Sequence, residues 1–360
     1  MRERIVFCLI CIVVFFEGCS IVKEKYEGVV TELKTPLEVF PMSLLSDSVV
    51  SLKFELPEPY IWGIVTDVFF VDSTIFMVDK KQGNIFRFNK NGIFINKIGS
   101  RGEGPGEFRK LTDVLVNENY VYAGNISERK LYCYTHEGVF IRTITFAFEL
   151  IYDDIIPLSN GRFLCHDIVG YKGENKIWIL NDEGQVDTTL LVHDAVYPYS
   201  HSSFNTINYT DTIGVYKILD PITGCIYVYD ENSNELNFRQ RFVSDFNGLD
   251  EFPGNDLLPQ VHEEYAYLAL CREMGNHVYL VWNTSESVGY HGIYSKMTNS
   301  VQAYKKIDMD LSGVPCFTLP VSTNVSEMVT VLTDEFDREC FPEEFRENLS
   351  ENTLVVNIFL

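Results

Sequence analysis

The sequence predicts an all-β fold, a six-bladed β-propeller built from four-stranded antiparallel blades. The first observation is a repeat, because Thr66-Asp67-Val68 returns 46 residues later as Thr112-Asp113-Val114. The second is that each copy contains short runs rich in Val, Ile and Phe, which suit a pleated, packed surface. The third is the aromatic content, 26 Phe and 20 Tyr among 360 residues. A period of about 45 residues with several strands in it is typical of propeller blades.

The first copy reads as four strands joined by turns. A link containing Gly83 separates the second and third strands. Asn91-Gly92 is a tight hairpin signal, because both residues tolerate a positive φ. The second copy repeats this pattern as far as Ile144. The strands predicted for the first copy are Thr66–Val71, Thr74–Val78, Ile85–Asn89 and Ile93–Ile98.

The later blades diverge in sequence but keep the spacing. The sixth contains only three predicted strands, so we expect Val49–Phe54 to supply the fourth from the other end of the chain. This pairing would close the ring and remove its open sheet edges. We expect blade three to start at Asp153, blade four to cover 204–242 and blade five to cover 265–307. The strands expected in blade six are Cys316–Leu319, Met328–Leu332 and Leu354–Phe359.

The first residues predict export rather than part of the fold. Arg2 and Arg4 precede an apolar run over 5–16, which is short for a membrane span, and Gly18-Cys19 follows. We expect a signal peptide over 1–18 and lipidation of Cys19, with an ordinary secretory signal cut nearby as the alternative. Residues 19–47 are then a lipidated tether to a propeller over 48–360, with a short helical insertion near 335–350. The protein would be exported to the cell envelope and anchored to the outer membrane or periplasmic side by its lipid.

Composition and motifs predict no catalytic residue, metal or cofactor. The chain carries a net charge of −22, which disfavours nucleic acid as a partner. It has neither a Gly-x-Ser-x-Gly nucleophile motif nor a Cys-x-x-Cys pair. Scattered cysteines fit buried thiols, and Cys316–Cys340 is the one disulfide we expect. Seven scattered histidines leave a metal site, assembled from separate blades, as an alternative.

A glycine-rich stretch joins the two clear repeats. The run Gly102-Glu103-Gly104-Pro105-Gly106-Glu107-Phe108 resembles the inter-blade signature of NHL-type repeats. With the N-terminal lipoprotein signal and the closing strand over 352–359, the chain resembles the six-bladed β-propeller lipoproteins of Bacteroidetes. The resemblance covers roughly Val49 to Leu360. It implies the fold, and it implies no particular activity.

One face of the predicted propeller collects the candidate ligand residues. In this fold the links between blades and the links from second to third strand lie on the same face. Loops on a rigid scaffold are the usual place for binding residues. The candidates in these links are Asp79, Arg101, Glu103, Arg109, Arg129, His166, Tyr171, Tyr199, His201 and His262.

The sequence favours a binding or scaffold module, whose partner would be a peptide, a glycan or another envelope protein. The alternative is an enzyme, a lyase or hydrolase with its site at the mouth of the axial channel. A third hypothesis is a sensor domain partnered with an outer-membrane transport system. An enzyme needs convergent titratable groups or a metal at the channel mouth, whereas a binding protein can manage with a broad aromatic and polar face. Three or more of the candidate His, Asp and Glu side chains meeting at the axis would favour the enzyme.

Overall fold

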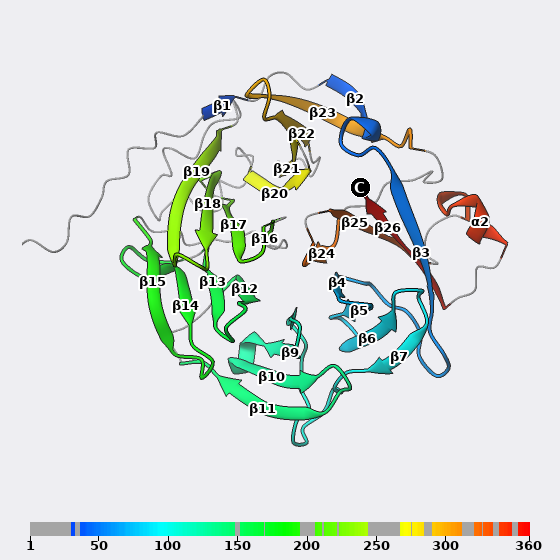
Figure 1. Cartoon of the computed structure of the whole chain (residues 1–360), viewed down its shortest axis with the longest axis vertical. Helices are drawn as coiled ribbons and strands as arrows, with labels where there is room; N and C mark the ends of the chain where they lie inside the picture. Colours follow the sequence, from blue (N-terminus) through cyan, green and yellow to red (C-terminus); the bar gives the residue numbers. More distant parts are fainter. Residues whose placement is uncertain are drawn as a thin grey trace, which may run out of the picture.

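Six β-sheets formed by the described residues surround a common axis, as the sequence predicts (Figure 1). Successive strands within each blade pair antiparallel and step outward from the axis. The fold is therefore a six-bladed β-propeller. The computed structural model describes residues 30–32, 37–147, 152–168, 170–194, 206–210, 212–221, 223–243, 267–274, 276–283, 290–311, 320–325, 327–333, 338–347 and 352–360.

The strands of the first blade begin and end close to the predicted positions, and blades two to five follow the predicted spacing. Blades one to three contain β4 (Asp67–Val71), β5 (Thr74–Asp79), β6 (Asn84–Asn89), β7 (Phe94–Lys97), β8 (Asp113–Val116), β9 (Tyr120–Asn125), β10 (Lys130–Thr135), β11 (Phe140–Thr145), β12 (Asp154–Pro157), β13 (Phe163–His166), β14 (Asn175–Leu180) and β15 (Val186–Val192). Blades four and five contain β16 (Ile207–Tyr209), β17 (Val215–Asp220), β18 (Cys225–Asp230), β19 (Glu235–Val243), β20 (Tyr267–Met274), β21 (His277–Asn283), β22 (Tyr290–Ser295) and β23 (Ser300–Asp308).

The sixth blade joins the two ends of the chain. Strand β25 (Met328–Leu332) pairs with β26 (Thr353–Phe359), and β26 pairs with β3 (Val49–Glu55) in a continuous antiparallel register. The predicted closure is thus confirmed. On the inner side, β24 (Ser322–Thr323) pairs in parallel with β4 of blade one. The expected inner strand at 316–319 lies outside the described residues.

The segment expected as a tether contributes two further strands. Strand β1 (Val30–Glu32) runs parallel to β19, and β2 (Leu37–Pro41) runs parallel to β23 (Figure 1). They cover the outer edges of blades four and five, where a strand would otherwise leave unpaired backbone groups. Phe40 is fully buried, so one aromatic side chain fixes β2 against the blade.

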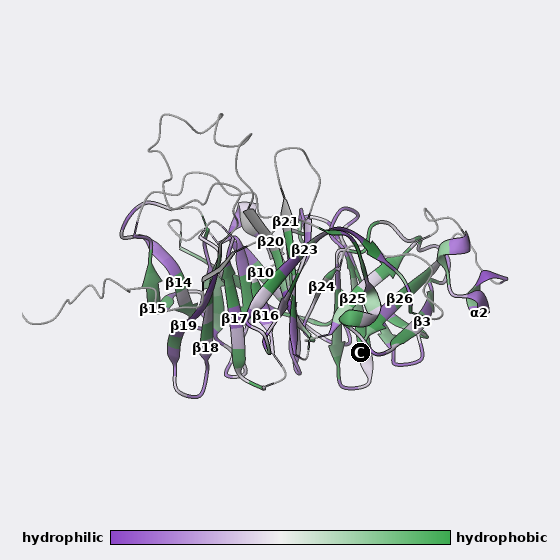
Figure 2. Ribbon diagram, turned by 90° about the horizontal axis from the view of Figure 1, so that it is seen from above, coloured by the Kyte–Doolittle hydropathy of each residue, from purple (hydrophilic) through white to green (hydrophobic). Residues whose placement is uncertain are grey.

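The core consists of apolar layers between neighbouring blades. One layer combines Val78 and Ile98 of blade one with Val114 and Tyr134 of blade two. Another joins blade six to blade one, where the Phe54 ring packs edge-on against another aromatic ring of that layer. Figure 2 shows hydrophobic residues concentrated within the strands and hydrophilic ones at the turns. Burial of these layers is what makes a ring of separate sheets stable.

Short helices and one disulfide lie in the remaining links. The stretch expected to be helical contains η4 (Arg338–Cys340) and α2 (Glu343–Arg346), and Phe341 beside them packs into the sixth blade. Cys340 is disulfide-bonded, and its expected partner, Cys316, lies outside the described residues. Two other short helices are η1 (Met42–Leu44) and η2 (Ile126–Glu128). The described free thiols are buried: Cys133, Cys165, Cys225 and Cys271.

The turns between the third and fourth strands recur at intervals of 46 residues, with a glycine of positive φ in each. In blade one the Asn89 side chain accepts hydrogen bonds from the N–H groups of Asn91 and Ile93, at 2.9 and 3.0 Å. Gly92, Gly138 and Gly184 occupy the equivalent turn positions with φ of 77°, 86° and 84°. A Cβ on Gly92 would lie 2.1 Å from the Lys53 carbonyl oxygen, so this turn also touches the preceding blade. The repeat therefore encodes contacts between blades as well as the strands.

A comparison of two glycine substitutions would separate the need for a positive φ at the turn from the contact with the preceding blade. Gly161→Ala places a side chain at φ 79° with no atom within 4 Å, and should destabilise the fold by about 1 kcal/mol through backbone strain alone. Gly92→Ala adds the collision with Lys53 and should cost at least about 2 kcal/mol. Urea unfolding of both variants measures the difference. Equal losses would show that the Gly92 turn does not press on the preceding blade.

Candidate functional site

Three aspartates begin the innermost strands of the first three blades at the end of the axis where the inter-blade links arrive. We call this end the linker face. Asp67, Asp113 and Asp154 stand at these positions, and Lys80 reaches toward them from the second-to-third-strand link of blade one. We call these four residues the axial cluster. They line a cavity of about 20 Å³, room for about one water molecule.

Hydrogen bonds from neighbouring threonine hydroxyls orient the first two aspartates. The Thr66 hydroxyl donates to Asp67 at 2.6 Å, and the Thr112 hydroxyl donates to Asp113 at 2.9 Å, so the repeated Thr-Asp dipeptide makes the same contact twice. Lys80 Nζ lies 3.1 Å from Asp67 Oδ1. Burial opposes the charge on Lys80, but the surrounding carboxylates outweigh it and raise the pKa of the ammonium group.

Asp154 ties the third blade to the fourth. Its Oδ2 accepts the Ile207 N–H at 2.7 Å, and its Oδ1 accepts the Ile155 N–H at 2.8 Å. The carboxyl is buried, and this burial raises its pKa to about 6. Asp154 therefore fixes the start of β16 relative to β12.

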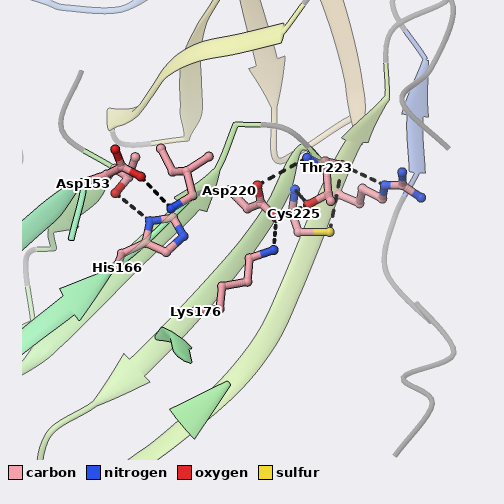
Figure 3. Close-up of polar contacts among 9 residues, drawn as sticks. Asp153, His166, Lys176, Asp220, Thr223 and Cys225 are labelled. Carbon is pink, nitrogen blue, oxygen red and sulfur yellow. Dashed lines mark hydrogen bonds and ion pairs between the residues drawn. The ribbon is translucent and has the colours of Figure 1, made fainter. Parts of the chain in front are cut away.

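A second group of polar side chains extends from Asp154 into the interface between blades three and four. We call it the buried polar network, and Figure 3 shows part of it. His166 Nδ1 lies 2.7 Å from the Thr206 hydroxyl. Lys176 Nζ donates to Asp220 Oδ2 at 2.6 Å, and the Thr223 hydroxyl also donates to this oxygen, at 2.5 Å. These charges are buried and paired, as burial of ionised groups requires.

His166 is the member of this network with unused capacity for hydrogen bonding. Its side chain is fully buried, and its Nε2 has no partner among the residues that the structure describes. Burial lowers the pKa of this imidazole to about 4, so it is neutral near pH 7. His166 is thus an internal group rather than one exposed on the ligand face.

A hollow on the linker face lies beside the glycine-rich loop. It has a volume of about 530 Å³ and lies between the link from blade one to blade two and the start of β10. We call it the loop depression. Arg109 Nε lies 3.5 Å from a carboxylate oxygen of both Glu103 and Glu128. The Tyr132 hydroxyl donates to Glu128 at 3.0 Å, so one side of the depression is held by a fixed carboxylate.

The structure brings only part of the predicted site together. Glu103 and Arg109 line the loop depression, and Arg101 lies in the same link, where its Nε donates to the Arg109 carbonyl at 3.0 Å. Arg129 occupies the neighbouring link, with φ 54° at the position equivalent to Gly83. These four residues therefore share one sector of the linker face, over blades one and two.

The other candidates are separate from this sector or outside the described residues. Asp79 is buried, and its Oδ1 accepts the Gln82 N–H at 2.9 Å, which shapes the link that follows β5. Tyr171 is exposed in the equivalent link of blade three. Three candidates are not among the described residues: Tyr199, His201 and His262.

Sequence reasoning missed the axial cluster. The Thr-Asp dipeptide marks the repeat, and its recurrence at the start of two inner strands also places two carboxylates at the axis. Among the described residues, the candidate His, Asp and Glu side chains do not converge there. Nor does the described part of the chain place three or more His, Cys, Asp or Glu side chains where they could hold a metal ion. No described helix has the length and apolar character needed to cross a membrane.

The buried imidazole predicts a pH dependence of stability. The unfolded chain protonates His166 near pH 6.5, whereas the folded chain resists until about pH 4, so unfolding takes up a proton in this range. Stability should fall as the pH drops from 6.5 to 4, by on the order of 3 kcal/mol from this group. His166→Gln should remove that part of the loss.

Urea unfolding of wild type and His166→Gln at several pH values measures it. Asp154, whose pKa burial raises to about 6, acts in the opposite direction in both proteins, so the effect of His166 is read from the difference between the two profiles. Identical pH profiles for the two proteins would rule out the assignment to His166.

Comparisons with known proteins agree with this architecture. The model of a domain of unknown function, DUF4934, matches residues 34–355. No curated protein matches the chain. Among solved structures the chain is similar to a candidate exported protein of Bacteroides fragilis NCTC 9343, with a TM-score of 0.72 and 17% identity over 92% of this chain and 99% of that one.

A second similar structure is a member of the DUF4221 family from Bacteroides vulgatus ATCC 8482. Its TM-score is 0.53, with 10% identity over 88% of this chain and 99% of that one. At these identities the two likenesses show the fold alone. The family model, in contrast, spans most of the sequence. The chain therefore belongs to the DUF4934 family.

Proposed function

We propose that the protein is an exported, lipid-anchored binding or scaffold module that engages its partner through the linker face. The observation that carries this proposal is the loop depression, which combines a volume of about 530 Å³ with exposed groups of both charge signs. Pockets of a few hundred cubic ångströms are the usual size for a small ligand or a short segment of a larger one. Glu103 and Arg109 are more than half exposed, so a partner can reach them.

The axial cluster brings four titratable side chains together at the axis, but its carboxylates are engaged within the fold. Asp67 and Asp113 each accept a hydrogen bond from the preceding threonine, and Asp154 accepts one from the start of β16. We assign them the task of fixing the ring, which leaves the exposed loops for recognition. Rigid scaffolds that present loops in this way are common among binding proteins.

The N-terminal sequence supports export and anchoring, and one comparison agrees with export. Residues 1–18 have the charge and apolar pattern of a signal peptide, with Cys19 after it. The fold neighbour from Bacteroides fragilis is described as a candidate exported protein. We assign the repeats to the NHL type on the run from Gly102 to Phe108. A peptide, a glycan or another envelope protein would be the partner.

Replacement of Cys19 tests the anchor. Cys19→Ala removes the thiol that would carry the lipid, so the exported protein should move from the membrane fraction to the soluble fraction. Detergent-phase partitioning of cells that express each form measures the change. Cys8→Ala is the control, because Cys8 lies within the predicted signal peptide and should leave partitioning unaltered. Unchanged membrane association of Cys19→Ala would contradict lipidation at this residue.

Obstruction of the loop depression tests the binding role. Arg109→Trp places a bulky ring in the hollow, whereas Lys90→Trp adds the same ring to an exposed turn of blade one on the opposite face. We expect the wild-type chain to bind at least one member of an array of envelope glycans and peptides. Arg109→Trp should weaken that binding at least about tenfold, a loss of about 1.4 kcal/mol, and Lys90→Trp should not. No binding, or equal binding by both variants, would contradict the proposal.

A further inference from the structure

The linker face over blades one and two has a charge opposite to that of the chain. The whole protein carries −22, yet the linker-face segments 79–84, 98–112 and 125–130, taken together with Asp67 and Asp113, contain seven basic and six acidic residues. Two other described links on this face are acidic: 55–66 has two Glu and no basic residue, and 338–347 has four Glu and two Arg. Among these described links the excess of positive charge is therefore confined to one sector, which we call the basic sector.

Backbone contacts bring the basic residues of this sector together. Arg101 pairs with Phe108 across the glycine-rich loop, and its Nε donates to the Arg109 carbonyl. A Cβ on Gly83 would lie 3.8 Å from Arg101 Cβ, which places Arg101 against the link that carries Lys81. The sector is thus a platform fixed by its backbone.

Several of these cations are not neutralised within the protein. Arg109 has ion pairs with Glu103 and Glu128, and Lys130 lies 3.7 Å from Glu128. In contrast, Lys81, Arg101 and Lys110 are exposed and form no ion pair with any other residue that the structure describes. Their charges are therefore available to an external anion.

The surface of the sector favours a hydrated polymer over a protein partner. Protein interfaces depend on aromatic or aliphatic side chains that fill pockets at their centre. The loop at the centre of this sector offers Gly102, Gly104, Pro105 and Gly106, with the Phe108 ring fully buried beneath it. Guanidinium and ammonium groups on a polar surface suit repeated carboxylate, sulfate or phosphate groups.

We propose that the basic sector binds an acidic polysaccharide, and this rests on the proposed binding role of the linker face. Lys81, Arg101 and Lys110 contact its anionic groups, and the loop depression receives part of the sugar chain. The strong net negative charge elsewhere repels the polymer, so contact is limited to this sector.

Titration with polygalacturonate tests this class of ligand. We expect wild type to bind, and its affinity to fall about twentyfold between about 50 and about 200 mM salt, as the release of about three counterions from a single-stranded polyanion requires. Lys81→Glu with Lys110→Glu should weaken binding at least tenfold, because two contacts become repulsive. The matched control is Lys90→Glu with Lys172→Glu, which makes the same charge change at two exposed lysines outside the sector and should bind as wild type does.

Other probes decide between the classes of ligand. Equal loss of binding in the two double variants would overturn the assignment to this sector. Tighter binding of polyaspartate than of polygalacturonate would replace the polysaccharide with an acidic peptide, and salt-independent binding of neutral dextran would remove the role of charge. If no polyanion binds while the array yields a ligand that Arg109→Trp blocks, this inference fails and the proposed function stands. If neither experiment yields a ligand, both fail.

Discussion

The pairing of β3 with β26 is the interaction on which the rest of the structure depends. Seven residues from near the start of the chain pair in register with seven from its end, Val49 with Phe359 and Glu55 with Thr353. Closing so long a loop has an entropic cost, but this cost grows only slowly with loop length. The apolar layer that forms against blade one, with Phe54 fully buried, offsets it. Because the ring closes, each blade has a neighbour on both sides, and the inner strands hold their positions around the axis.

The repeat made the fold predictable from sequence, and the reason is physical. The turn residues and the strand residues recur together, so the Asn-Gly turn at Gly92 and the Thr-Asp pair at Asp67 each locate one element. Strand β2 escaped prediction because it pairs in parallel with a strand more than 250 residues away and buries a single aromatic side chain, Phe40. No local sequence pattern predicts a contact of that kind.

The candidate site was predictable only where the backbone itself was unusual. The cluster of glycines after Gly99 indicated an irregular loop on one face, and Glu103 and Arg109 do line a hollow there. The sequence predicts His166 on the same face, but its side chain is buried, because it ends a buried strand and does not stand in the link that follows. Sequence gives the link in which a residue lies, and packing decides whether its side chain points to solvent.

Strands β1 and β2, on the outer edges of blades four and five, also affect how the domain responds to a pulling force. The chain passes through β1 and then β2 before it reaches β3, so these pairs stand between the N-terminal side and the strand that closes the ring. A pull from that side is borne first by the hydrogen bonds to β19 and next by those to β23. Both pairs can detach without opening any of the antiparallel pairs within the blades. These two pairs would therefore separate before the force reaches the pairing of β3 with β26.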